Sequence, residues 1–293
     1  MKKILAVILL FVLIFNICGC GTGKYKKYES LIIDNANDGI NTKIDTDIWS
    51  QGYFVKENMA DQTISVEGNN YTGSYKNSIV ETMNSYTTDV YCDENFIEFG
   101  LRSDTGKLAY VNLMNKDFFN TEPYLEDVSN PKENAIILAT EIAAKYVDDI
   151  KEYTVIIEEP YTRYKEKDGK NYEITYYIIT FAKKINNYFS SDYISVKVTS
   201  KGNLASIFMG DIGVFDNITI DFDNITMDQS ILSKVDLTYQ DTELTVIQRE
   251  IKDQKIVVTP EGYVCMYSEV RVNGINASNK EVDTGIRILT VLG

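Results

Sequence analysis

The sequence of 293 residues contains no histidine. This absence excludes a Ser-His-Asp triad, a Cys-His pair and any zinc site with histidine ligands, because each of them needs an imidazole ring. Catalysis would have to rest on carboxylates, lysine, tyrosine or an isolated serine. We therefore predict a protein that is not an enzyme, and we predict neither a cofactor nor a metal site.

Basic residues are also scarce. The chain has 29 lysine and arginine residues against 43 aspartate and glutamate residues, which gives a formal net charge of −14. A chain with this excess of negative charge repels the phosphate backbone of nucleic acids, so we expect no nucleic-acid partner. The local cluster of Lys24, Lys26 and Lys27 suits contact with anionic headgroups, and it suits a solvated tether equally well.

Long apolar runs are missing from the chain, apart from one at its N-terminus. Lys2 and Lys3 precede a nearly unbroken apolar run from Ile4 to Ile17. This run is shorter than the roughly 20 apolar residues that a membrane-spanning helix needs. A charged start, an apolar centre and small residues at the end are typical of an export signal. Its last residues, Ile17-Cys-Gly-Cys20, resemble the lipobox of bacterial lipoproteins.

That resemblance implies that residues 1–19 are a signal peptide and that Cys20 becomes thioether-linked to diacylglycerol, whose acyl chains include palmitate. Each buried methylene contributes about 0.8 kcal/mol, so two acyl chains hold a protein at a bilayer where a single one would not. We therefore expect a lipid anchor on the extracytoplasmic side of the cell membrane. The alternatives are an uncleaved N-terminal anchor and cleavage by the ordinary signal peptidase.

Cysteine is rare as well, with four residues in the chain. Cys18 would leave with the signal and Cys20 would carry the lipid, which leaves Cys92 and Cys265, both in predicted strands. Disulfides persist outside the cell, but sequence does not give the distance between the two Cα atoms. The sequence is compatible with a disulfide between Cys92 and Cys265 and also with two buried free thiols.

The remainder of the chain divides into four segments. Residues 20–60 are polar without a sustained period, which is typical of a tether. Residues 61–128 show strand-like alternation and hairpin turns, with a short helix predicted over Asn77–Tyr86. Residues 129–210 and 211–293 each show a helical pattern followed by a meander of strands.

The clearest helical pattern begins at Pro131, with Asn130 and Glu133 placed as in a capping box. Its apolar positions share one broad face: Ala135, Ile136, Leu138, Ala139, Ile142, Ala143, Tyr146 and Val147. A shorter helix is predicted over Met227–Tyr239. The predicted fold class is therefore α+β, with two helix-on-antiparallel-sheet modules, an imperfect duplication, preceded by a β-rich N-terminal region.

The segment Ser129–Ala139, with its serine, acidic residue and repeated alanines, is similar to the opening of PepSY-type domains. The polar hairpin that ends in Lys197–Gly202 is similar to the close of such a domain. The resemblance covers residues 129–209 well and residues 223–292 weakly. It implies a domain of secreted or membrane-attached bacterial proteins that binds or restrains partners, proteases among them.

Two patterns point to chemistry by carboxylates. Asp-Thr-Gly occurs at residues 104–106 and 283–285, and aspartic proteases use two such loops so that two carboxylates share one proton. Asp-Thr-Gly is also a favourable hairpin turn, which is the interpretation we prefer. Glu158 and Glu159 are adjacent acids that a glycosidase could use, but 43 acidic residues make such adjacency common.

Tyrosine is abundant, with 21 residues. A cluster around one predicted hairpin comprises Tyr161, Tyr164, Tyr172, Tyr176 and Tyr177. Tyrosine offers a large contact area at low entropic cost and is enriched in recognition surfaces. The alternative is that these residues only pack in the core, since tyrosine favours strands. If the protein has a binding face, we expect it on this hairpin.

These observations predict a membrane-anchored extracytoplasmic lipoprotein of non-enzymatic type, which binds an envelope protein or peptide or regulates one. One alternative is a solute-binding lipoprotein of a transporter, although the alternation of strands and helices typical of such proteins is missing. The other is a hydrolase that uses carboxylates alone.

Overall fold

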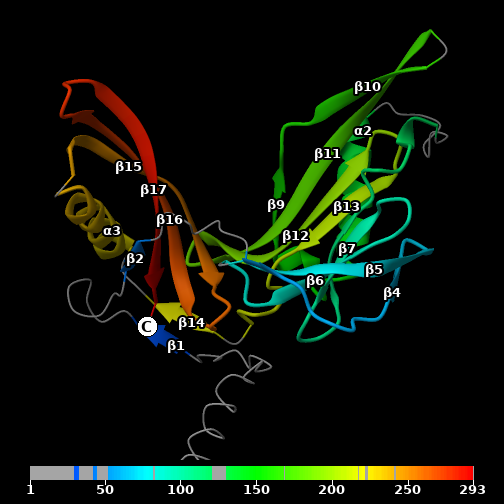
Figure 1. Ribbon diagram of the computed structural model, residues 1–293, viewed down its shortest axis with the longest axis horizontal. Coiled ribbons are helices and arrows are strands. Elements are labelled where there is room, and N and C mark those ends of the chain that lie inside the picture. Colours follow the sequence, from blue (N-terminus) through cyan, green and yellow to red (C-terminus); the bar gives the residue numbers. More distant parts are fainter. Residues whose placement is uncertain are drawn as a thin grey trace, which may run out of the picture.

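Figure 1 shows the computed structural model of the chain. The structure describes residues 30–32, 42–44, 52–81, 83–120, 130–167, 169–216, 218–221, 224–240 and 242–292. The predicted signal peptide, the predicted lipid-attachment residue Cys20 and most of the predicted tether lie outside these residues.

Strands make up 55% of the structure and helices 14%. The strands are β1 (Ser30–Ile32), β2 (Thr42–Ile44), β3 (Gly52–Phe54), β4 (Gln62–Val66), β5 (Asn69–Val80), β6 (Thr87–Cys92), β7 (Glu98–Arg102), β8 (Leu108–Asn112), β9 (Thr154–Ile157), β10 (Tyr161–Lys167), β11 (Lys170–Ile185), β12 (Tyr188–Thr199), β13 (Leu204–Met209), β14 (Thr219–Asp221), β15 (Leu244–Val258), β16 (Val264–Asn276) and β17 (Glu281–Val291). The helices are α2 (Pro131–Ala143), α3 (Asn224–Tyr239) and the short 3-10 helices η1 (Phe118–Asn120) and η2 (Ile150–Glu152).

One mixed sheet contains 15 of these strands, while β1 and β14 form a separate parallel pair. The main path of the sheet runs β2-β17-β16-β15-β12-β13-β8-β7-β6-β5-β3. Three strands attach beside this path: β11 pairs with β12, and β9 and β10 both pair with β11. A further strand, β4, pairs with β5.

The strand β12 lies in the middle of the sheet and pairs with strands of both halves. Residues 194–198 of β12 pair with β13 in antiparallel fashion. At its start, Phe189 and Ser190 pair in parallel with Lys255 and Ile256 of β15. Figure 1 shows the β15–β17 meander on one side of this connection and β5–β13 on the other. The two halves are therefore one hydrogen-bonded sheet.

The predicted fold class is wrong. The structure is mostly β with one large mixed sheet, and it does not consist of two helix-on-sheet modules. The predicted β-rich region also joins this sheet, because β8 pairs with β13 through Tyr110 and Phe208. The alternation of apolar and polar residues predicts single strands, but it does not determine which distant strands pair. The predicted helix over Asn77–Tyr86 is wrong too, since β5 continues to Val80.

Local turn chemistry explains several of the hairpins. Between β11 and β12, Asn186 and Asn187 both have positive φ, 47° and 72°. A two-residue hairpin loop of type I′ needs positive φ at both positions, and asparagine tolerates it. The two asparagines therefore suit this turn, and it brings Ile185 opposite Tyr188.

The two α-helices lie on different parts of the sheet. In α2, Pro131 occupies the first turn as predicted, and Ala139 and Ile142 are buried against β11 and β12. The predicted capping box is not formed: the Asn130 side chain makes no cap bond and instead donates to the Glu133 carboxylate at 3.1 Å. In α3, one buried stripe faces β15 and β17; its residues are Met227, Ile231 and Val235.

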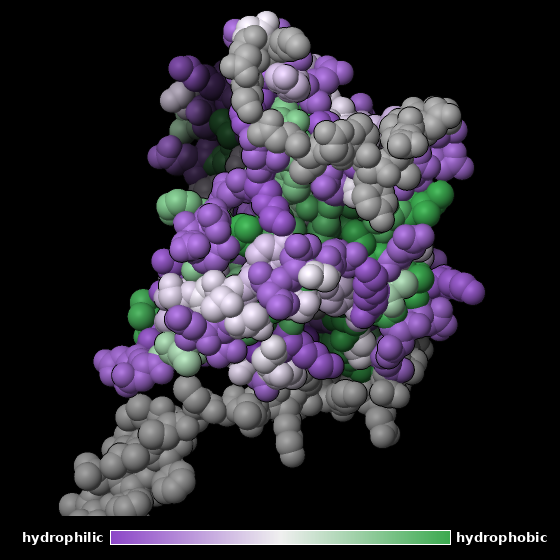
Figure 2. Space-filling model, turned by 90° about the vertical axis from the view of Figure 1, so that its right-hand side faces the viewer, coloured by the Kyte–Doolittle hydropathy of each residue, from purple (hydrophilic) through white to green (hydrophobic). Residues whose placement is uncertain are grey.

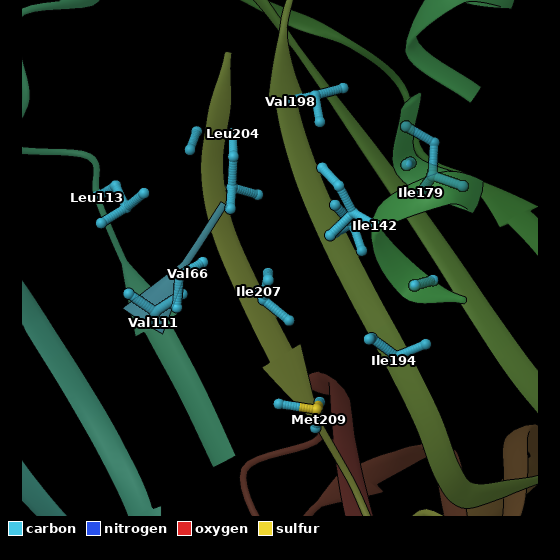
Figure 3. Packing of buried hydrophobic residues seen from close by; sticks show 14 of the residues in the cluster. Val66, Val111, Leu113, Ile142, Ile179, Ile194, Val198, Leu204, Ile207 and Met209 are labelled. Carbon is cyan, nitrogen blue, oxygen red and sulfur yellow. The ribbon is translucent and has the colours of Figure 1, made fainter. Parts of the chain in front are cut away.

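Apolar packing forms one core under each helix. The larger core joins α2 to β12 and β13, and Figure 3 shows Ile142 of the helix beside Val198 and Ile194 of the sheet. The smaller core joins α3 to the β15–β17 meander. Beside α2 a cavity of about 480 Å³ opens, with Leu138 and Ile142 among its lining residues. Figure 2 shows a hollowed apolar area bordered by hydrophilic side chains on one face of the molecule.

A buried carboxylate joins three distant segments beside β12. Asp211 follows β13 and is fully buried. Its Oδ1 accepts hydrogen bonds from the backbone N–H of Ser85 at 3.1 Å and from the Ser85 hydroxyl, and its Oδ2 accepts one from the Ser191 hydroxyl at 2.7 Å. We call these three residues the Asp211 cluster. Burial raises the pKa of Asp211 to about 6, although the bonds from Ser85 and Ser191 lower it.

The pKa of Asp211 predicts a specific pH dependence of stability. Because the folded-state pKa is raised above the ordinary value of 3.8, the folded protein holds this proton more tightly than the unfolded chain, and stability falls as pH rises from about 4 to above 6. Asp211→Asn removes this titration. Urea denaturation measures the unfolding free energy of the variant and of the unmodified protein at each pH. Between about pH 4 and pH 7, the unmodified protein should lose roughly 2 kcal/mol of stability relative to the variant. A difference that is independent of pH would contradict this.

Candidate functional site

The five tyrosines predicted as a binding face all lie on the β10–β11 hairpin, but they do not share one face. Tyr161 stands opposite Tyr176, and Lys165 stands opposite Tyr172. Because side chains alternate along a strand, Tyr161, Tyr172 and Tyr176 occupy one face of the hairpin. Tyr164, which stands opposite Glu173, shares the other face with Tyr177.

Burial divides the same tyrosines further. Tyr176 is 2% exposed and Tyr177 is buried, so both belong to the larger core. Tyr161 is half-buried, and its ring stacks on that of Tyr176 with centroids 5.2 Å apart. Lys197 lies over the Tyr161 ring at 5.6 Å. These three tyrosines thus stabilise the hairpin by packing.

The remaining two tyrosines lie toward the end of the hairpin. Tyr164 is 72% exposed and Tyr172 is 37% exposed. Figure 1 shows the β10–β11 hairpin projecting beyond the neighbouring strands. Within the described part of the chain, β10 forms a ladder with β11 alone. The opposite edge of β10 therefore presents backbone N–H and C=O groups that no described strand pairs, next to an exposed aromatic ring.

The strand β9 continues this edge. It pairs with residues 179–182 of β11, in line with β10, and it exposes Val155 and Ile157. Glu158, Glu159 and Pro160 separate the two strands and are all exposed. Charged residues and proline protect sheet edges from unwanted pairing. Here they lie between β9 and β10 and do not extend along β10. The adjacent acids Glu158 and Glu159 lie on the surface.

The other residues that sequence singled out are not brought together. Asp104 binds Arg102 at 3.0 Å in the turn after β7, and Asp283 binds Arg271 at 2.6 Å across β16 and β17. Each carboxylate is thus held by its own arginine. Cys92 on β6 and Cys265 on β16 are free thiols. Among the described residues, no three Asp, Glu or Cys side chains are grouped so that they could hold a metal ion.

A second surface feature was not predicted from the sequence. A cavity of about 430 Å³ opens on the sheet beside β6, β8 and β13. Its lining consists of Tyr53, Asn77, Ile79, Glu81, Asn84, Tyr86, Thr88, Val90, Glu98, Ala109, Tyr110, Tyr193, Phe208 and Met209. We call it the aromatic hollow, because five of these residues have aromatic rings. It contains two glutamates, and its described lining has no lysine or arginine.

Two glycines allow the rings of the hollow to lie close to the backbone. A Cβ atom on Gly100 would collide with the Tyr110 ring, and one on Gly210 would lie 2.7 Å from the Tyr193 ring. Larger residues at either position would displace the rings. The Tyr110 ring is nearly parallel to that of Phe208, with an interplanar angle of 10° and centroids 5.4 Å apart. The two rings are therefore stacked with an offset.

Hydrogen bonds orient the polar groups of the hollow. The Tyr110 hydroxyl donates to Glu98 at 2.7 Å, and the Tyr86 hydroxyl donates to the carbonyl of Met209 at 2.6 Å. Burial and the hydrogen bond to Glu98 raise the pKa of Tyr110. Burial, together with Glu81 and Asp211, raises the pKa of Tyr193 to about 12. Tyr110 and Tyr193 therefore stay neutral, and the acidic side chains of the described lining are those of Glu81 and Glu98.

The hollow also adjoins the Asp211 cluster. Tyr86 follows Ser85 directly, and the backbone N–H of Asp211 donates to the carbonyl of Ser191 at 2.6 Å, two residues before Tyr193. The hollow draws side chains from β3, β5, β6, β7, β8, β12 and β13, which no local pattern connects. The one local signal was Gly100 inside a predicted strand, since an isolated glycine in a strand often marks a close approach.

Comparisons of the chain with protein-family models, with curated proteins and with solved structures found no match. In the part of the chain that the structure describes, neither α-helix has the length and hydropathy that a membrane span requires. Two surfaces are left as candidate sites: the free edge of β10 with Tyr164, and the aromatic hollow.

Proposed function

We propose that the protein is a lipid-anchored, extracytoplasmic binding protein without enzymatic activity, and that the free edge of β10 receives an extended segment of an envelope protein or peptide. The observation that carries this proposal is the exposed Tyr164 on a strand whose other edge is paired by none of the described strands. Strand addition to such an edge supplies main-chain hydrogen bonds, and side-chain contacts supply selectivity.

The hairpin is built to present this edge firmly. The stacked rings of Tyr161 and Tyr176 fix its base, and Lys165 binds Asp117 at 2.8 Å nearer its end. A rigid edge loses little conformational entropy when a partner strand is added. Tyr164 is flanked by the exposed acids Glu166 and Glu173, so the surface favours a partner segment with basic side chains.

The lipobox-like residues before the described part of the chain support the anchoring half of the proposal. Two acyl chains on Cys20 would hold the body at the membrane surface. The absence of histidine and the pairing of Asp104 and Asp283 with separate arginines weigh against a hydrolase. The aromatic hollow favours a second candidate, a lipoprotein that binds a small solute, because its volume is within the range of small-molecule sites.

The anchor is tested by Cys20→Ala. We expect the variant to remain unprocessed or to be released from the membrane, because the sulfur that would carry the lipid is gone. Membrane fractionation and mass spectrometry of the N-terminus measure both outcomes, with Cys92→Ala as the matched control that keeps the anchor. Full processing and full membrane association of the Cys20→Ala protein would contradict the proposal.

The binding edge is tested by a photoreactive amino acid placed at Tyr164 in intact cells. Placement at Tyr263, an exposed tyrosine in the turn between β15 and β16, is the matched control. We expect a discrete protein adduct from position 164 alone, and peptide mapping should locate it in one continuous segment of the partner. Equal adducts from both positions, or none from position 164, would overturn the role of this edge.

A further inference from the structure

We infer that the aromatic hollow binds a small organic ammonium ion through the faces of its aromatic rings and the carboxylates of Glu81 and Glu98. This inference goes beyond the proposed partner binding and does not depend on it, because the hollow shares no residue with the β10 edge. The ligand class follows from the shape of the hollow, from its charge and from the kind of groups that line it.

The shape provides ring faces. Tyr110 lies across Gly100, and the nearly parallel ring of Phe208 stacks on it with an offset. Tyr53 and Phe208 are both exposed, so solvent reaches the aromatic surface. A cation over the face of an aromatic ring is attracted by the negative charge of the ring face, and several rings around one cation form the usual site for alkylated ammonium groups.

The charge of the hollow has one sign. Glu81 and Glu98 lie in the lining, whose described residues include no lysine or arginine. The buried carboxylate of Asp211 lies near enough to raise the pKa of both Tyr86 and Tyr193. Burial of a cation here would relieve this concentration of negative charge, whereas an anion would be repelled.

The protein already makes one contact of the proposed kind at the border of the hollow. The guanidinium of Arg102, which is not part of the lining, lies over the ring of Tyr86 at 4.1 Å. The ring of a hollow residue thus attracts a cation from the protein itself. A neutral sugar would also stack on the rings, but it carries no positive charge to attract the two carboxylates of the lining.

The experiment uses the full chain and measures binding of choline by titration calorimetry. Its neutral carbon isostere, 3,3-dimethyl-1-butanol, has nearly the same shape without the charge. We expect saturable binding of choline and binding of the isostere that is weaker by at least about tenfold, because a desolvated cation over aromatic rings gains this much. Equal binding of the two, no saturable binding of choline, or binding of glucose in its place would overturn the inference.

The location is tested with two matched variants. Glu98→Gln removes one charge of the hollow but keeps an acceptor for the Tyr110 hydroxyl, whereas Glu261→Gln removes an exposed charge from the turn between β15 and β16. We expect Glu98→Gln to weaken choline binding by roughly tenfold and Glu261→Gln to leave it unchanged. An equal effect of both variants, or no effect of Glu98→Gln with the fold intact by circular dichroism, would place binding elsewhere and contradict the inference.

Discussion

The buried carboxylate of Asp211 is the interaction on which the rest of the structure depends. It accepts hydrogen bonds from Ser85, between β5 and β6, and from Ser191 on β12, while Asp211 itself follows β13. A buried charge without partners would be very unfavourable, so each of these segments has to be in place for the others to be stable. The cluster thus fixes the connection between the N-terminal strands and the centre of the sheet.

The same constraint positions the aromatic hollow. Tyr86 comes one residue after Ser85, and Tyr193 comes two residues after Ser191. The hydrogen bonds of these serines to Asp211 therefore also fix where the two rings lie. A neighbouring carboxylate, Asp192, is held by the Tyr153 hydroxyl at 2.6 Å and by the backbone N–H of Gly213 at 3.0 Å. Burial raises the pKa of Asp192 as well. Each of these buried carboxylates has hydrogen-bond partners in fixed directions, and such a satisfied network makes the centre of the sheet rigid.

Local features of the fold could be predicted from sequence, and the pairing of distant strands could not. The predicted start of α2 at Pro131 is confirmed, and the turn at Asn186 and Asn187 likewise follows from backbone preferences of single residues. The fold class failed because Phe189 and Ser190 pair in parallel with β15, which depends on register between segments that are far apart. The tyrosine hairpin was found, but the alternation that separates Tyr164 from Tyr161 was overlooked. The hollow was missed because its rings come from four strands and from the segment that precedes β6.

The central claim is that one carboxylate couples three segments, and a double-mutant cycle tests it most directly. Ser85→Ala and Ser191→Ala each remove a donor to Asp211, and the double variant removes both. Because the two serines share one buried partner, unfolding free energies from urea denaturation should be non-additive by about 1 kcal/mol or more. Additivity within about 0.3 kcal/mol would show that the two segments are independent and would contradict the account.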